Sequence, residues 1–187
     1  NEYKQDIYIS KTLQNYINAA KTEIDKHNVA WDNVKKITNP YEFIHTQVPN
    51  NKLSISKYKP LSRSYFKFVE LANIFSLITE IESKPTITSF HLAEGPGGFI
   101  EAMVNMRKNS TDTYYGMTLL NSDINVPGWN KSQHFLHKHE NVIIEKGSSG
   151  NGDLLNPENL EYVYNKYKNS MEIVTGDGGF DFSVDFN

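Results

Sequence analysis

The sequence predicts an α/β fold in which a mostly parallel sheet follows an N-terminal helical extension. After Pro85 short apolar runs alternate with helical or loop segments, which is typical of a doubly wound parallel sheet. Before Pro85 the apolar residues instead recur at helical spacing. We therefore expect two parts: a helical extension with a basic loop over residues 1–60, and an α/β domain over residues 61–187.

Helices are expected at four places in the part of the chain that precedes the sheet. Residues 9–27 show the apolar spacing of an amphipathic helix. Two shorter helices are expected near Trp31 and after Pro40, because proline suits the first turn of a helix. Residues 61–83 carry a long apolar stripe, which predicts one long helix with Ser62 as its N-cap.

Four strands and two further helices complete the predicted fold. The strands are expected at residues 87–93, 113–119, 141–147 and 171–177. The helices are expected at residues 98–107 and 158–168. The sequence stops shortly after the fourth strand, where a doubly wound sheet normally continues, so we interpret it as truncated within the fold.

The composition narrows the classes of function. Hydrophobic residues make up 38% of the chain, which is typical of a globular protein and not of a disordered one. No apolar run reaches the roughly 18 residues of a membrane span. The absence of cysteine excludes disulfides and thiolate catalysis, and it favours an intracellular location. A net charge of -3 argues against a protein that coats nucleic acid by charge alone, but it leaves room for a local basic patch.

Residue usage also bears on the origin of the chain. Arginine occurs only at Arg63 and Arg107, whereas asparagine and lysine are abundant. We interpret this bias as that of an AT-rich genome, such as that of a parasite or a large DNA virus. The N-terminus has neither an initiator methionine nor the apolar core of a signal peptide, so we expect a fragment or a processed chain.

The segment EGPGGF at residues 94–99 stands between a predicted strand and a predicted helix. Glycines in such a turn let the backbone approach a ligand closely, and the first N–H groups of the helix point at that ligand. Ligands of parallel sheets bind at the carboxyl ends of the strands, where Leu119, Asp153 and Asp177 are also expected. The alternative, in which glycine and aspartate serve only the geometry of tight turns, stays open.

The acidic residues of these turns favour a cationic ligand. A dinucleotide-binding turn would read G-x-G-x-x-G, a spacing that EGPGGF lacks, and a carboxylate would repel its pyrophosphate. A cofactor that carries adenosine together with sulfonium and ammonium groups would instead be attracted by Glu94, Asp153 and Asp177. S-adenosylmethionine fits this description.

Six motifs taken together resemble one enzyme family. They are NPYEFI (39–44), LSRSYFKFVEL (61–71), AEGPGGFIE (93–101), YGMTL (115–119), GNGDLLNPENL (150–160) and GDGGFD (176–181). They occur in the order seen in cap-specific mRNA nucleoside 2'-O-methyltransferases, which belong to the FtsJ-like group. The resemblance implies a Rossmann-like enzyme that uses S-adenosylmethionine to methylate a ribose 2'-hydroxyl of RNA near an mRNA cap. It also implies a place in a capping or transcription assembly.

The resemblance further implies roles for individual residues. The residues implied to bind the cofactor are Glu94, Gly95, Pro96, Gly97, Gly98, Phe99, Thr118, Leu119, Asp153 and Asp177. Lys67 and Asp177 match the first lysine and the aspartate of the family's Lys-Asp-Lys arrangement around the target ribose. The second lysine and a glutamate of that arrangement would follow the end of this sequence. Glu94 stands where the family often has a small residue.

A basic cluster precedes the helix expected from residue 61. It consists of Lys52, Lys57, Lys59 and Arg63, with Tyr58 and Tyr65 nearby. Such a cluster can track RNA phosphates or a cap, while the tyrosines stack on bases. An ordinary solvated loop explains the same residues equally well.

Two further groups of residues receive no role. His134 and His137 lie one helical turn apart, but no carboxylate completes a zinc-binding spacing, so no metal site is expected. Isolated tryptophans such as Trp31 and Trp129 are more often packing anchors than base-stacking groups. The absent second lysine leaves open a function of another class, in which a catalytically inactive methyltransferase-like domain acts as an RNA-binding or scaffold module.

Overall fold

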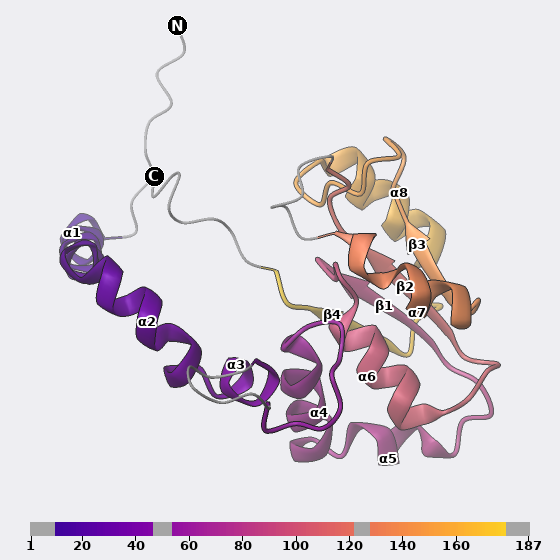
Figure 1. Ribbon diagram of the computed structural model, residues 1–187. Coiled ribbons are helices and arrows are strands. Elements are labelled where there is room, and N and C mark those ends of the chain that lie inside the picture. Colours follow the sequence, from indigo (N-terminus) through magenta and orange to yellow (C-terminus); the bar gives the residue numbers. More distant parts are fainter. Residues whose placement is uncertain (1–9, 47–53, 122–127, 179–187) are drawn as a thin grey trace, which may run out of the picture. The chain divides into compact units, whose positions relative to one another are not determined.

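The computed structural model of the protein describes residues 10–46, 54–121 and 128–178 (Figure 1). The chain divides into two compact units, residues 1–55 and 56–187. The described residues of the first unit form helices. Those of the second unit form a parallel sheet with helices on both faces, which is the Rossmann-like α/β class that the sequence predicts.

Helices of the first unit begin within a few residues of the predicted positions. They are α1 (Lys11–Thr22), the 3-10 helix η1 (Glu23–His27), α2 (Asn28–Thr38) and α3 (Pro40–His45). The Ser10 hydroxyl caps α1 by accepting a hydrogen bond from the Leu13 N–H at 3.3 Å. Asn39 caps α3 in the same way, and Pro40 stands in its first turn. The helices expected here are confirmed, although α1 ends early and the chain continues as η1.

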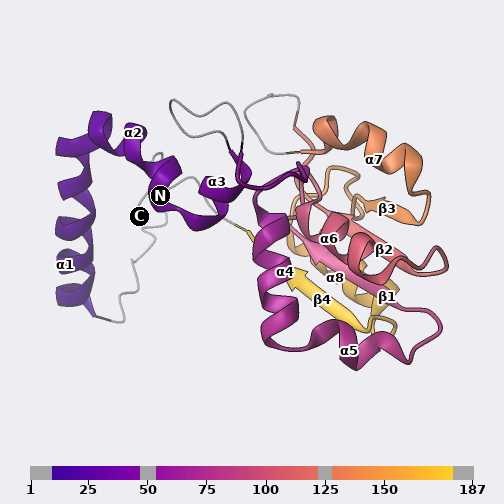
Figure 2. The ribbon, with the colours of Figure 1, turned by 60° about the horizontal axis from the view of Figure 1, so that its bottom comes forward.

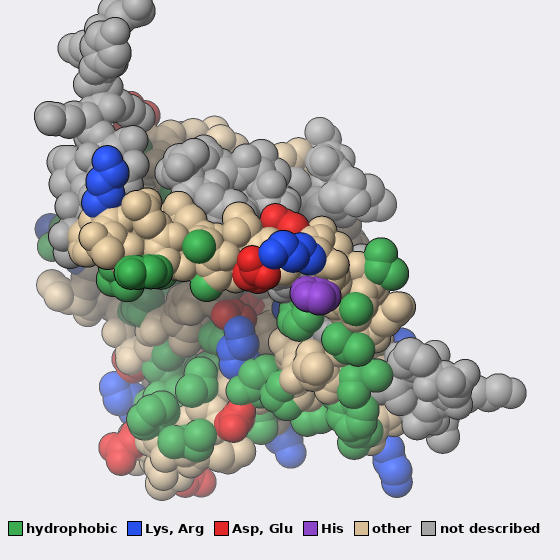
Figure 3. Space-filling view, turned by 90° about the vertical axis from the view of Figure 1, so that its left-hand side faces the viewer, with side chains coloured by type: hydrophobic (Ala, Val, Ile, Leu, Met, Phe, Trp, Pro, Cys, Tyr) green, Lys and Arg blue, Asp and Glu red, His purple; other side chains and the backbone are tan. Residues whose placement is uncertain are grey.

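The helices of the first unit expose an apolar surface (Figure 3). No residue of α1 is buried. Exposed hydrophobic residues of these helices include Leu13, Tyr16, Ile17, Val29, Trp31, Val34 and Ile37. Among all residues that the structure describes, no helix is both long and apolar enough to span a membrane. An exposed apolar surface of this kind is typical of an interaction surface.

The single helix predicted over residues 61–83 is wrong in two respects. The segment forms two helices, α4 (Ser64–Ile74) and α5 (Leu77–Glu82), and Ser62 is not the N-cap. Ser76 separates the helices in the left-handed conformation, with φ of 50°. The break redirects the chain so that α5 packs against the core. Burial in the core therefore outweighs helix propensity, which is a weak local preference.

Four parallel strands form the sheet, in the order β3-β2-β1-β4. They are β1 (Thr88–Leu92), β2 (Thr113–Met117), β3 (Val142–Glu145) and β4 (Ile173–Gly176). Each strand lies within the range that the sequence predicts. In the register of the sheet, Phe90 of β1 stands opposite Tyr115 of β2 and Val174 of β4. Because all strands run in one direction, their carboxyl ends lie along one edge of the sheet.

Helices cover both faces of this sheet (Figure 2). On one face α6 (Gly98–Arg107) packs beside α4 and lies against Gly116. On the opposite face α8 (Pro157–Tyr167) packs the ring of Tyr167 against Tyr115. Adjacent residues of a strand point to opposite faces, which explains why Tyr115 and Gly116 meet different helices. Both helices lie where the sequence predicts them, within one residue.

The main core lies between the sheet and the helices α4 and α6. Its buried hydrophobic residues are Phe68, Ala72, Ile81, Ile87, Phe99, Ile100, Ala102, Met103, Val104, Tyr114, Trp129, Val142 and Ile173. Trp129 comes from the 3-10 helix η2 (Trp129–Ser132), which leads into the short surface helix α7 (Gln133–Lys138). At about 25 cal/mol per Å² of apolar area removed from water, this cluster is the main source of stability.

Replacing Ser76 by glycine is expected to stabilise the protein. A residue with a side chain in the left-handed conformation costs about 1 kcal/mol, and glycine removes most of that cost. We expect urea denaturation to show a free energy of unfolding about 1 kcal/mol higher for Ser76→Gly. Ser83→Gly is the matched control, because Ser83 ends α5 with an ordinary φ of -71°. An equal gain in both variants would contradict this explanation.

Candidate functional site

An ion pair joins α4 to the carboxyl end of β4. Lys67 on α4 places its Nζ 2.6 and 2.7 Å from the two carboxylate oxygens of Asp177, which directly follows β4. The side chains of Lys67 and Asp177 are 36% and 30% exposed, so both can contact a bound molecule. From the sequence, only the family resemblance predicts that Lys67 and Asp177 act together. In the structure the two side chains are in contact.

Glu94 lies in the turn after the neighbouring strand β1 and is buried. One of its carboxylate oxygens accepts a hydrogen bond from the Ile100 N–H at 2.9 Å, in the first turn of α6. Burial raises the pKa of Glu94 to about 8; hydrogen bonds from the backbone of Ile100 and Phe99 oppose this shift, and the charge of Asp177 adds to it. The first N–H groups of α6, expected to point at a ligand, therefore already bind Glu94.

Gly97 and Gly98 shape the entry of the glycine turn into α6. Gly97 has φ of 109°, a conformation that residues with side chains rarely adopt. A Cβ at Gly98 would lie 2.1 Å from the Ser64 hydroxyl and 2.3 Å from the Ser62 hydroxyl, and these two hydroxyls bond to each other. The first turn of α6 thus rests directly on the start of α4. The same contact fixes Lys67, which lies one turn further along α4.

The 3-10 helix η2 also supports the glycine turn. The Ser132 hydroxyl donates a hydrogen bond to the Pro96 carbonyl. The ring of Trp129 lies 3.3 Å from the position that a Cβ of Gly97 would take. Trp129 is 5% exposed, so it is a packing residue and is not available to stack on a base.

Thr118 connects the glycine turn to the loop that follows β3. It is buried and directly follows β2. Its methyl group lies 2.8 Å from the Cβ position of Gly95, and its carbonyl oxygen lies 2.0 Å from that of Gly152. Both positions therefore need glycine if the two loops are to close on Thr118. Leu119, the next residue, keeps 39% of its surface exposed.

The loop that carries Asp153 is organised by Asn159, a fully buried residue of α8. The side-chain oxygen of Asn159 accepts hydrogen bonds from the Ser148 hydroxyl at 3.1 Å and the Ser149 N–H at 2.9 Å. Its amide nitrogen donates to the Asp153 carbonyl at 2.9 Å. The half-buried Asp153 carboxylate accepts a hydrogen bond from the Leu155 N–H at 2.9 Å. Asn159 therefore holds the backbone on which Asp153 stands.

Residues 57–63 run along α6, and we call this segment the basic strap. Glu101 of α6 holds it: the Tyr58 hydroxyl donates to one carboxylate oxygen at 2.6 Å, and the Leu61 N–H donates to the other at 2.7 Å. Burial, and then the bond to Glu101, raises the pKa of Tyr58 to about 12. Tyr58 thus anchors the basic strap to Glu101 of α6. The exposed basic residues of the strap are Lys57, Lys59 and Arg63.

The structure gathers the predicted cofactor residues along the carboxyl edge of the sheet. They follow the strands in turn: residues 94–99 after β1, Thr118 and Leu119 after β2, Asp153 after β3 and Asp177 after β4. Lys67 joins them from α4. Lys52 and residues 179–181 of the last motif lie outside the described residues. Within the described part of the chain, no group of three or more His, Cys, Asp or Glu residues could hold a metal ion.

Three residues that support the site were not assigned from the sequence: Glu101, Ser132 and Asn159. Asn159 belongs to the motif GNGDLLNPENL, which marks its position but not the loop that it binds. Glu101 ends the motif AEGPGGFIE, yet its partner in the strap lies 40 residues earlier. No motif covers Ser132, so nothing in the sequence could have identified its contact.

Known proteins are similar to this chain over most of its length. Residues 60–186 match the family of FtsJ-like methyltransferases. A similar protein is the cap-specific mRNA (nucleoside-2'-O-)-methyltransferase 2 of Drosophila melanogaster, which is 23% identical over 188 residues. That match covers 90% of this chain and 25% of the fly protein, so the chain spans about a quarter of the length of this relative.

The stability of the protein is expected to fall as the pH rises through the titration of Glu94. Folding raises the pKa of this carboxyl from 4.5 to about 8, so between these values the folded protein keeps a proton that the unfolded chain releases. The stabilisation is complete below pH 4.5 and is lost as the pH rises toward 8, with a slope of up to about 1.4 kcal/mol per pH unit.

Urea denaturation at several pH values measures this slope. We expect Glu94→Gln to flatten it, because the amide does not titrate but can still accept the hydrogen bond from Ile100. The exposed Glu158 at the start of α8 provides the control variant Glu158→Gln, which should keep the native slope. A native slope in Glu94→Gln would show that another group is responsible.

Proposed function

The chain belongs to the FtsJ-like methyltransferase family, and on that basis we propose that it transfers a methyl group from S-adenosylmethionine to a ribose 2'-hydroxyl of RNA. The proposed target is a nucleotide next to an mRNA cap, because the similar fly protein is a cap-specific 2'-O-methyltransferase. The observation that carries the proposal is the ion pair of Lys67 and Asp177 at the carboxyl edge of the sheet, beside the glycine turn.

The residues at this edge suit a cationic cofactor that carries adenosine. Asp177 after β4 and Asp153 after β3 supply partly exposed acidic groups, and a positive group is attracted to such groups in a partly buried site. Gly95 and Gly97 let the turn pack closely against Thr118 and Trp129, which fixes the backbone that would face the cofactor. Asp153 would lie near the adenine. When bound, S-adenosylmethionine supplies an electrophilic methyl group on its sulfonium.

Lys67 and Asp177 would orient the target ribose. A ribose 2'-hydroxyl is a poor nucleophile, so the site must align it and stabilise the charge that develops on its oxygen as its proton passes to solvent, to which the pair is partly exposed. The Lys67 ammonium has three N–H donors, and Asp177 occupies at most two of them. At least one donor therefore stays available for the 2'-oxygen. The carboxylate of Asp177 keeps Nζ in place while this happens.

The basic strap is the proposed contact for RNA phosphates near the target. Its exposed cations stand on a backbone that Glu101 fixes. Cations on a fixed backbone lose less conformational entropy when they bind phosphate than cations on a free loop. Arg63 directly precedes α4, so the strap leads to the helix that carries Lys67.

The proposal is tested by nucleoside analysis of capped RNA that has been incubated with the protein and labelled S-adenosylmethionine. We expect the label on a ribose 2'-oxygen. Lys67→Met should lower kcat by a factor of roughly 100 or more, because it removes the group that orients the hydroxyl. The affinity for the cofactor should change little. Lys168→Met, at an exposed position after α8, is the matched control and should keep the native kcat.

Two results would change the assignment. Label on a base instead of a ribose would overturn the proposed reaction. Binding of capped RNA by the folded protein, without any methyl transfer, would favour a catalytically inactive RNA-binding module.

A further inference from the structure

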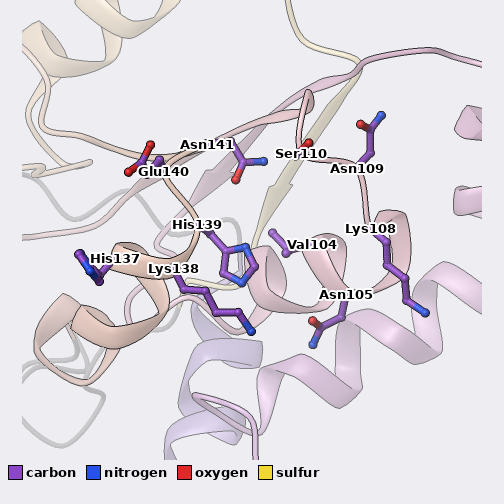
Figure 4. Close-up of a pocket in the computed structure, with 10 residues that line it drawn as sticks. All are labelled: Val104, Asn105, Lys108, Asn109, Ser110, His137, Lys138, His139, Glu140 and Asn141. Atoms are coloured by element: carbon purple, nitrogen blue, oxygen red, sulfur yellow. The ribbon is translucent and has the colours of Figure 1, made fainter.

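A polar pocket lies at the end of α6 that is remote from the glycine turn (Figure 4). It lies between the ends of α6 and α7 and the start of β3, and we call it the α6–α7 pocket. Its volume is about 540 Å³, which falls within the range of about 300–1,000 Å³ that is typical of ligand sites. None of its lining residues belongs to the proposed methyl-transfer site.

One wall of this pocket is rigid because hydrogen bonds to Asp112 hold its residues in place. Asp112 is fully buried and accepts hydrogen bonds from Arg107 at 2.8 Å and from the Asn109 amide at 3.1 Å. Asn141 donates to the Asp112 carbonyl at 2.8 Å. Asn109 and Asn141 line the pocket, so their bonds to Asp112 preserve the shape of the wall before any ligand binds.

Two lysines give the α6–α7 pocket a positive charge. Among the residues that the structure describes, Lys108 and Lys138 have no carboxylate within ion-pair distance. In Figure 4 the Lys138 ammonium points toward Asn105, whereas Glu140 lies on the side of the pocket away from Lys108. Burial and the neighbouring charge of Lys138 lower the pKa of His139, so the lysines supply the charge.

The basic strap connects the proposed methyl-transfer site with this pocket. At one end, the Leu61 side chain lies 3.4 Å from the Cβ position of Gly97, before the first turn of α6. At the other end, the Asn105 amide donates a hydrogen bond to the Tyr58 hydroxyl at 3.0 Å. Asn105 itself lines the α6–α7 pocket. The strap therefore follows α6 from its start to the edge of the pocket and places exposed lysines along the way.

We propose that the α6–α7 pocket binds backbone phosphates of the substrate RNA, at nucleotides beyond the one that is methylated. This inference rests on the proposed function for the identity of the substrate. Lys108 and Lys138 would neutralise the phosphates and position the strand without reading its sequence. The 10 residues of α6 extend over about 15 Å, which a stacked strand spans in four to five nucleotides of about 3.4 Å each.

A structural role for the same lysines predicts a different result. Lys108 follows the last residue of α6 and Lys138 is the last residue of α7, where a positive charge complements the partial negative charge of a helix end. Removing the charges would then change the free energy of unfolding. It would leave the salt dependence of RNA binding unaltered, because that dependence counts the contacts to phosphate.

RNA affinity measured against salt concentration separates the two roles. With the full chain and a capped single-stranded RNA of about ten nucleotides, the double variant Lys108→Gln/Lys138→Gln should reduce the slope of log K against log salt by about 1.4. This value corresponds to about 0.7 for each lost phosphate contact, and binding should weaken roughly tenfold at low salt. Lys168→Gln, directly after the helix α8 of the opposite sheet face, should keep the native slope.

A capped dinucleotide is too short to reach from the glycine turn to the pocket, so it should bind the double variant and the native protein equally. An unchanged slope with the longer RNA would overturn the proposal, and so would an equal loss with the dinucleotide. The result does not depend on catalysis. A reduced slope in a protein that transfers no methyl group would confirm the RNA contact and count only against the proposed function.

Discussion

The contact between α4 and α6 at Gly98 is the constraint on which the candidate site depends. A Cβ at this position would lie 2.1 Å from the Ser64 hydroxyl and 3.0 Å from the Tyr65 backbone nitrogen, so glycine lets the two helices meet this closely at their first turns. This contact sets the position of α4, so that Lys67 can bind Asp177 after β4. It also places the ion pair close to the glycine turn that leads into α6. In an FtsJ-like methyltransferase this fixed spacing has a chemical use, since methyl transfer requires the acceptor and the donor to be aligned.

The loops at the carboxyl edge of the sheet support one another. Gly95 of the loop after β1 and Gly152 of the loop after β3 both pack against Thr118. Asn159 binds the backbone of Asp153. A shift of the backbone in one loop therefore displaces the neighbouring loop, because the two are packed without free space between them. The helix α6 extends this organisation away from the edge, because the basic strap follows it from the glycine turn toward the α6–α7 pocket.

Much of this fold could be predicted because short apolar runs and a glycine turn are local signals. The break at Ser76 could not, since a serine in the left-handed conformation has no sequence signature and the packing of α5 on the core decides the outcome. Glu94 was expected to face a ligand, but burial directs its carboxylate to the N–H of Ile100. Asn159 and its loop lie about ten residues apart, and only the folded chain shows that they bond.

Calorimetric titration of S-adenosylmethionine into the purified chain tests most directly whether the carboxyl edge is a cofactor site. We expect saturable binding by the native chain and none by Gly97→Val/Asp153→Ala, because valine rarely adopts φ of 109° and the second change removes the carboxylate proposed to lie near the adenine. Asp153→Ala alone keeps the turn intact and should weaken binding about tenfold. Absence of binding by a native chain whose circular dichroism shows it to be folded would contradict the cofactor site.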